Sequence, residues 1–196
     1  MVFSTIADGV ARGVGQVGHV VTGGFLEPRI RLGVSRTYQV PRPFAEMTVA
    51  ENIRVGLMPD SLRAMIFGAP DPAREKDLAL SVGFTEADLG RTPADLPMGD
   101  LRKLELARTL ATGAKVLLLD EVFAGLTSAE IRMIADLILK LRQQGFTFLI
   151  VSHDLPAMEP LVDRAIAIER GSLIAEGSFD DVLASEAVRA SYLGGT

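Results

Sequence analysis

Two adjacent carboxylates, Asp120 and Glu121, follow a short apolar run at 117–119 and are candidates for metal binding and acid–base catalysis. An apolar run bounded by polar residues is typical of a strand buried on both faces of a sheet. In open α/β sheets, ligands bind at the carboxyl ends of the strands. One carboxylate there can hold Mg²⁺ and the next can polarise a water molecule, as phosphoryl transfer requires. Two acids after an apolar run are also typical of an ordinary solvated loop.

A histidine, His153, follows a second apolar run at 146–151. Because consecutive parallel strands usually lie close together, we expect His153 near Glu121. An imidazole at that place could donate a hydrogen bond to a terminal phosphate and hold a water molecule. A single histidine after a strand is also a common structural turn residue.

Two weaker signals flank these residues. Gln39 ends a strand predicted at 36–40, before a proline-broken loop, and its amide can accept a hydrogen bond from a metal-bound water. Met98, Gly99 and Asp100 precede a helix predicted at 101–110. A glycine-containing loop at a helix N-terminus is a ready anion site. Each signal, taken alone, is equally typical of an ordinary strand end or helix start.

The elements that position these residues alternate between strands and helices, which predicts an α/β fold with a parallel sheet. Thr48 with Glu51, and Thr127 with Glu130, predict capping boxes at the starts of two helices. The predicted helices are 48–57, 101–110, 128–144 and 179–192, and 73–90 is predicted to be a further helical segment with a loop. A third buried strand is predicted at 165–169, with a turn beginning at Gly171.

Composition narrows the class of protein. The net charge is -5 and no basic face is evident, which argues against nucleic acid as a partner. The chain has no cysteine, so disulfides and thiolate metal sites are excluded, as suits a reducing cytosol. It also has no secretory signal pattern and no run of about 20 apolar residues that could form a membrane helix. We therefore expect any membrane role to come through a partner protein.

In this order, the residues resemble the nucleotide-binding subunits of ABC transporters over about 30–194. The positions similar to the family's motifs are Gln39 for the Q-loop, 96–100 for the signature loop, 116–120 for Walker B, Glu121 for the catalytic glutamate, 124–127 for the D-loop and His153 for the switch histidine.

The resemblance implies ATP and Mg²⁺ as cofactors. It implies catalytic roles for Glu121 and His153, and metal contacts for Asp120 and Gln39. The nucleotide-binding positions that it implies are Gln39, Met98, Gly99, Asp100 and Asp120.

Within the family, 35–44, 47–53, 124–127 and 188–194 are similar to the ATPases of branched-chain amino-acid importers. A lipopolysaccharide-export ATPase has a similar ending, but the Arg-Thr-Tyr-Gln stretch at 36–39 fits it less well. The resemblance therefore implies coupling of ATP binding and hydrolysis to branched-chain amino-acid import.

The resemblance also implies the fold, the partners and the location. The expected fold is a P-loop NTPase-like parallel sheet core, N-terminally incomplete, with a small helical ABC-type subdomain. Residues 1–43 would form the remnant of the N-terminal core, 44–105 the helical subdomain and 106–196 the C-terminal core. The helical subdomain would contact membrane-spanning permease subunits, and a second ATP-binding subunit would complete a head-to-tail dimer. The chain would be cytoplasmic and peripheral on the inner face of the plasma membrane.

The chain departs from the family pattern in three features. The chain contains no Gly-x-x-x-x-Gly-Lys-Ser/Thr, the phosphate-binding Walker A loop, and the segment 8–18 has Val14 and Gly15 where Lys and Ser/Thr would stand. Pro97 replaces the signature serine, and Val122 replaces the usual proline after the catalytic glutamate. Three interpretations stay open: an importer ATPase whose missing loop is supplied otherwise, a non-hydrolysing dimer partner, and a truncated relic.

Overall fold

The computed structural model describes residues 33–37, 41–58 and 69–193. Its central element is a three-stranded parallel sheet in the order β1 (Val34–Arg36), β2 (Val116–Asp120) and β3 (Thr147–Val151). The register pairs Val116 with Val34 on one side and with Thr147 on the other. The predicted α/β fold with a parallel sheet is therefore confirmed, and Asp120 lies opposite Val151 at the carboxyl edge.

The strands form where apolar side chains can be buried. Leu117 and Leu119 of β2, and Phe148 and Ile150 of β3, are all buried. The first strand begins at Val34, two residues before the predicted start, while 38–40 lie outside the described residues.

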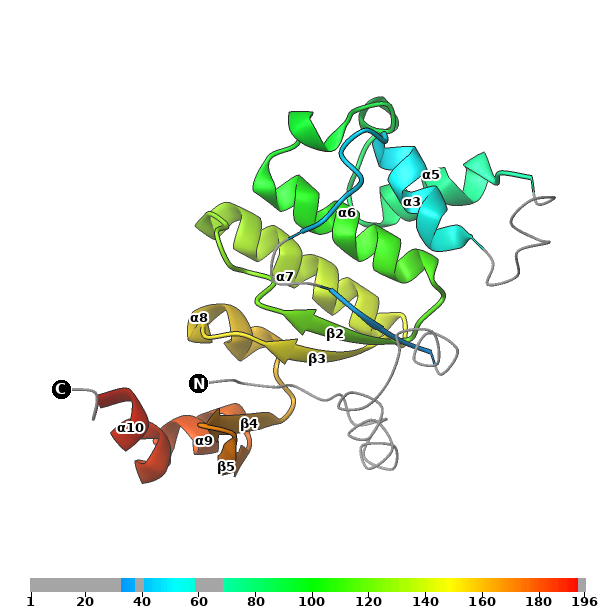
Figure 1. Ribbon diagram of the computed structural model, residues 1–196. Coiled ribbons are helices and arrows are strands. Elements are labelled where there is room, and N and C mark those ends of the chain that lie inside the picture. Colours follow the sequence, from blue (N-terminus) through cyan, green and yellow to red (C-terminus); the bar gives the residue numbers. More distant parts are fainter. Residues whose placement is uncertain (1–32, 38–40, 59–68, 194–196) are drawn as a thin grey trace.

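A helical layer, drawn at the top of Figure 1, comprises α3 (Val49–Leu57), α5 (Pro72–Ser81) and α6 (Met98–Ala111). Single turns η2 (Glu86–Asp88) and η3 (Pro93–Asp95) connect α5 to α6. The capping box predicted at Thr48 and Glu51 is confirmed. Gly56 lets α3 approach α6 closely, since a Cβ there would lie 2.5 Å from the Arg108 carbonyl oxygen.

Helix α6 begins at Met98, three residues before the predicted start. The residues predicted as a glycine-containing loop therefore form the first turn of the helix itself. The same helix crosses the predicted subdomain division at 105/106, because it continues to Ala111.

Helix α7 (Ser128–Gln143) packs between this layer and the sheet (Figure 1). The capping box at Thr127 and Glu130 is confirmed, and Ile134, Ile138 and Leu141 of α7 are buried in the core. The chain then forms α8 (Leu155–Met158) and η4 (Glu159–Leu161) after β3.

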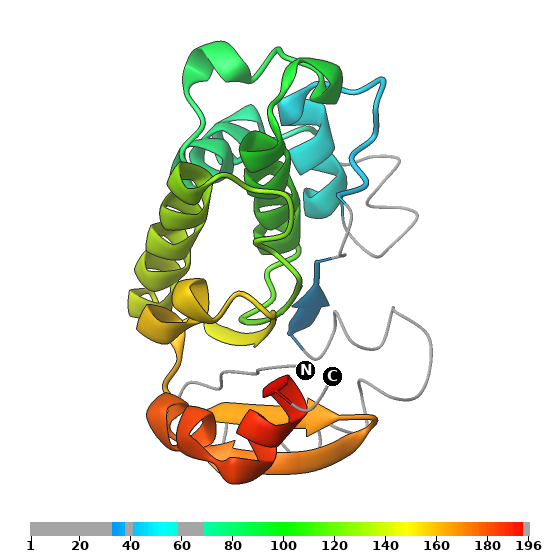
Figure 2. The ribbon, with the colours of Figure 1, turned by 90° about the vertical axis from the view of Figure 1, so that its left-hand side faces the viewer.

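The strand predicted at 165–169 is confirmed, but it does not belong to the parallel sheet. The segment forms β4 (Ala165–Glu169), which pairs antiparallel with β5 (Ser172–Gly177) in a separate two-stranded sheet. The cause is a tight turn, in which Arg170 and Gly171 both have positive φ and reverse the chain. The C-terminal helical segment is divided at Ser185 into α9 (Phe179–Ala184) and α10 (Glu186–Leu193). Figure 2 shows this unit at the end of the molecule opposite the helical layer.

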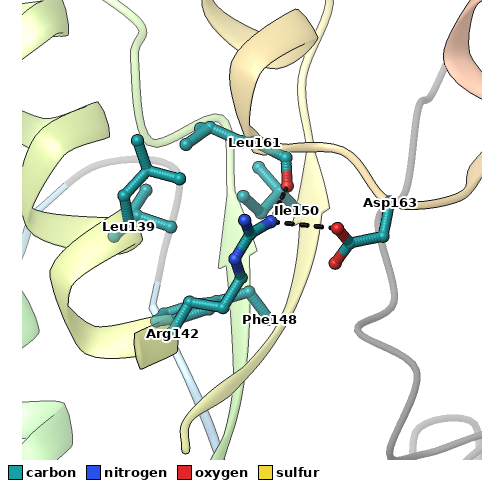
Figure 3. A pocket seen from close by; sticks show the side chains of 7 residues that line it. Leu139, Arg142, Phe148, Ile150, Leu161 and Asp163 are labelled. Carbon is teal, nitrogen blue, oxygen red and sulfur yellow. Dashed lines mark hydrogen bonds and ion pairs between the residues drawn. The ribbon is translucent and has the colours of Figure 1, made fainter. Parts of the chain in front are cut away.

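Arg142, in the last turn of α7, bonds to the segment that leads into this C-terminal unit (Figure 3). Its Nη1 donates to the Leu161 carbonyl oxygen at 3.3 Å and pairs with Asp163 at 3.0 Å. Its side chain also lines a small apolar hollow with Phe148 and Ile150. Among the described residues, no helix combines the length and the apolar character needed to cross a bilayer.

Candidate functional site

Glu121 lies one residue past β2 in an unusual backbone conformation. Its N–H donates to the Val151 carbonyl oxygen at 2.8 Å, which extends the pairing of β2 with β3 by one residue. Its φ is +50°, a left-handed conformation that costs a non-glycine residue about 1–3 kcal/mol. The buried Arg102 of α6 supports this turn, since its Nη2 donates to the Glu121 carbonyl oxygen at 3.2 Å.

The Glu121 carboxylate meets His153, as the sequence predicts. His153 Nδ1 lies 3.0 Å from a Glu121 carboxylate oxygen. The Glu121 side chain is 18% exposed and that of His153 is 72% exposed, so the pair has one sheltered and one accessible member. The carboxyl ends of β2 and β3 thus bring together an acid and an imidazole that are 32 residues apart.

Asp120 is held by a partner that the sequence analysis did not identify. Its Oδ2 lies 2.8 Å from Arg36 Nη2 on the neighbouring strand β1. Its N–H donates to Thr37 Oγ1 at 3.3 Å, and the Thr37 N–H donates to the Leu118 carbonyl oxygen at 2.9 Å. The ion pair with Arg36 neutralises Asp120, so a cation that binds Asp120 competes with that guanidinium.

Met98, Gly99 and Asp100 lie in the first turn of α6. The Gly99 N–H donates to Glu130 Oε1 at 2.9 Å, while Met98 is exposed. Asp100 Oδ1 lies 2.8 Å from Lys103 Nζ on the same helix. The structure therefore places these predicted nucleotide contacts at an occupied helix N-terminus.

Gln39 and the segment 8–18 lie outside the described residues, so their predicted roles stay predictions. Within the described part of the chain, no three His, Cys, Asp or Glu side chains are grouped to hold a metal. Mg²⁺ in phosphoryl-transfer sites is commonly held by one or two carboxylates together with substrate phosphates. Asp120 fits that donor set as its single carboxylate.

Sequence reasoning missed Arg36, Thr37 and Arg102 as parts of this site. Arg36 and Thr37 are more than 80 residues from Asp120, and only the strand register brings them together. Arg102 lies in the helix predicted at 101–110, but nothing in the local pattern marks its charged side chain as buried.

Comparison with known proteins identifies the family. The family model described as "ABC transporter" matches residues 4–124. The chain belongs to the ABC transporter family. The match includes the segment 8–18, where the phosphate-binding loop is expected.

Curated relatives are named as amino-acid transport proteins. The chain is 31% identical over 173 residues to the probable branched-chain amino acid transport ATP-binding protein LivG of Archaeoglobus fulgidus, with 84% of this chain and 66% of the relative covered. It is 32% identical over 176 residues to the high-affinity branched-chain amino acid transport ATP-binding protein LivG of Escherichia coli (strain K12), covering 84% and 69%. The chain thus spans about two thirds of the length of these relatives.

Solved structures agree with this fold. The ADP conformation of an ATP-binding cassette of an ABC transporter superposes with a TM-score of 0.75 at 27% identity, covering 89% of this chain and 73% of that one. A nucleotide-free ATP-binding cassette gives 0.74 at 25% identity, covering 88% and 73%. This ABC transporter chain therefore has the fold of an ATP-binding cassette.

Proposed function

We propose that this chain is the ATP-binding subunit of an ABC transporter that imports branched-chain amino acids. The observation that carries the proposal is the contact of Glu121 with His153, 3.0 Å apart at the carboxyl edge of the sheet. The names of the curated relatives support the substrate class. The sheet edge supports the chemistry, because ligands of open α/β sheets bind there.

Glu121 and His153 have different roles in hydrolysis: Glu121 acts on the attacking water and His153 on the phosphate. The Glu121 carboxylate accepts a proton from the attacking water, for which general-base catalysis contributes about 10²–10⁴-fold. His153 Nδ1 faces Glu121, which leaves Nε2 to meet a phosphate oxygen. A phosphate oxygen needs a donor, so the histidine has to carry protons on both nitrogens when it makes both contacts.

Asp120 is the residue that would hold Mg²⁺, with Gln39 as a further contact. When bound, the cation neutralises the charge that develops on the transferred phosphoryl group. Until then Arg36 holds the Asp120 carboxylate in place through its 2.8 Å ion pair.

The helical layer is the proposed contact with permease subunits. Its surface carries the exposed apolar side chains Phe44 and Met47 just before α3. A groove where β1, α3 and α6 meet is lined by Arg42, Val55 and Arg108, among others. Arg108 stacks on the Phe44 ring at 4.8 Å, which fixes one wall of this groove. An exposed apolar edge beside a groove suits docking of a partner segment.

The test is ATP hydrolysis by the chain assembled with its permease subunits and a second ATP-binding subunit. We expect Glu121→Gln to lower Mg²⁺-dependent turnover by at least about 10²-fold, because the general base is lost. Glu159→Gln, at an acid in η4 outside the site, is the matched control and should keep wild-type turnover. Equal turnover of wild type and Glu121→Gln would overturn the catalytic role of Glu121.

A second function, a non-hydrolysing dimer partner, is favoured by specific observations. The chain contains no Gly-x-x-x-x-Gly-Lys-Ser/Thr, a loop whose N–H groups and lysine hold the phosphates in P-loop NTPases. Pro97, the N-cap of α6, has no hydroxyl, and the Gly99 N–H already donates to Glu130. Affinity capture with an intact ATP-binding subunit tests this function. Recovery of a stable heterodimer whose turnover is unchanged by Glu121→Gln would favour it over the first.

A further inference from the structure

The groove where β1, α3 and α6 meet carries charges of both signs. Its volume is about 190 Å³, the space that about six molecules of liquid water fill. Arg42 and Arg108 contribute positive charge to its lining, and Glu105 contributes negative charge. Val55 adds an aliphatic side chain, and the hydroxyl groups come from Ser35, Thr109 and Thr112. The groove therefore offers contacts to an anion, to a cation and to an apolar group.

Two of the arginines in this groove have no acidic partner. Arg108 Nη1 donates to the Arg42 carbonyl oxygen at 2.9 Å, and its guanidinium stacks on the Phe44 ring at 4.8 Å. Burial lowers the pKa of the Arg108 guanidinium. Within the ranges that the structure describes, neither Arg42 nor Arg108 has a carboxylate at ion-pair distance. Arg36, which also lines the groove, is different because it pairs with Asp120. A carboxylate that enters the groove would therefore gain charge-assisted hydrogen bonds from Arg42 and Arg108.

The position of Glu105 favours a ligand that carries both charges. Glu105 and Arg108 are three residues apart on α6, so their side chains are neighbours, with Cβ atoms typically about 5–6 Å apart. An α-amino acid holds its ammonium and its carboxylate on one carbon atom, so it can meet both side chains at once. A ligand with only negative charge would instead face the Glu105 carboxylate unfavourably.

We propose that this groove binds a free α-amino acid. Its carboxylate lies against Arg42 and Arg108, and its ammonium group against Glu105. An aliphatic side chain of the ligand then packs on Val55. The inference rests on the proposed function for the branched-chain class of this amino acid, while the charge pattern stands by itself.

A bound amino acid would regulate transport by competition. The same groove is the proposed docking place of a permease segment, and a ligand that fills it excludes that segment. Amino acid that accumulates on the side of the membrane where this chain works would thus slow its own import. The groove would act as a product-feedback site.

The experiment is a titration of the isotope-labelled full chain with leucine, followed by NMR at the Nε–H groups of Arg42 and Arg108. We expect saturable shifts at both. Two compounds test the two charges: 4-methylpentanoate is leucine without its ammonium group, and 3-methylbutylamine is leucine without its carboxylate. Each should bind at least about tenfold more weakly than leucine, the effect of one charge-assisted hydrogen bond.

Three variants assign the contacts. Arg42→Gln, at an exposed side chain, should weaken leucine at least about tenfold. Glu105→Gln should weaken leucine but leave 4-methylpentanoate unchanged, and amide dispersion verifies folding of each variant. Arg132→Gln is the matched control, because it removes an exposed guanidinium from α7 and should leave leucine binding unchanged.

The inference is wrong if leucine gives no saturable shift, if 4-methylpentanoate binds as tightly as leucine, or if Arg42→Gln binds leucine like the wild type. Leucine binding by a chain that fails to bind ATP would refute the proposed function and leave this inference standing. A chain that binds ATP but not leucine would refute this inference alone.

Discussion

Arg102 offers the sharpest stability test, because it is a buried charge that connects α6 to the candidate site. Its residue is 2% exposed, and its Nη1 lies 3.2 Å from a carboxylate oxygen of Glu105, whose side chain is 10% exposed. Its Nη2 donates to the Glu121 carbonyl oxygen at 3.2 Å. Arg102→Met keeps much of the length of the side chain and removes the contacts that its guanidinium makes, these two among them.

Removing one member of a buried ion pair costs about 3–5 kcal/mol, because the remaining charge loses its partner in a poorly solvated place. Domain stabilities are about 5–15 kcal/mol, so this loss is a large fraction of the whole. We therefore expect Arg102→Met to lower the free energy of unfolding by about 3–5 kcal/mol. Equilibrium unfolding in urea, followed by circular dichroism, measures this free energy. If its slope against urea concentration is the same in wild type and variant, the two free energies can be compared directly.

Two further variants distinguish the effect of losing the ion pair from the effect of losing side-chain volume. Arg102→Met combined with Glu105→Met should recover at least about 1 kcal/mol, since it removes the buried carboxylate together with the guanidinium that faces it. Arg132→Met, on the exposed face of α7, should change stability by less than about 0.5 kcal/mol. A loss in Arg102→Met no larger than that of Arg132→Met would show that the buried ion pair does not stabilise the fold.

Two other predictions concern packing and pH. Gly56→Ala should destabilise the chain by about 1–3 kcal/mol, because its Cβ would overlap the Arg108 carbonyl oxygen at 2.5 Å, whereas Gly90→Ala has open space and should be better tolerated in the same thermal unfolding assay. The Thr85 hydroxyl, then the Thr85 N–H and Arg91, lower the pKa of Asp88 from 3.8 to about 2. Because the folded-state pKa is the lower one, this contribution is present above pH 3.8 and is lost as pH falls towards about 2. Stability should therefore fall less steeply with acid in Asp88→Asn, and parallel acid-unfolding curves would contradict this.

The sequence predicts well those features that depend on neighbours along the chain. The capping boxes at Thr48 and Thr127 are confirmed. They could be predicted because the cap and its partner are only three residues apart. The buried strand ending at Asp120 is confirmed because its apolar run has no helical period. The proximity of Glu121 and His153 follows from one rule, that consecutive parallel strands usually lie side by side.

Features that depend on distant pairing escape prediction. The strand at 165–169 is predicted, but its absence from the parallel sheet is not, because the apolar pattern does not tell which strands pair with one another. The contact of Arg36 with Asp120 requires the strand register, which no local pattern contains. Likewise, the spacing of Glu130 to Thr127 predicts a capping residue, but the second bond of Glu130, to Gly99, depends on how α6 and α7 pack.

The proposed function depends most on the binding of ATP with Mg²⁺ through Asp120. Isothermal titration calorimetry of the purified full chain with ATP, in the presence and absence of Mg²⁺, measures this binding directly. We expect micromolar, Mg²⁺-dependent binding to the wild type and to Glu121→Gln, and loss of the Mg²⁺ dependence in Asp120→Asn. No heat of binding from the folded wild type with Mg²⁺-ATP would contradict the proposed function.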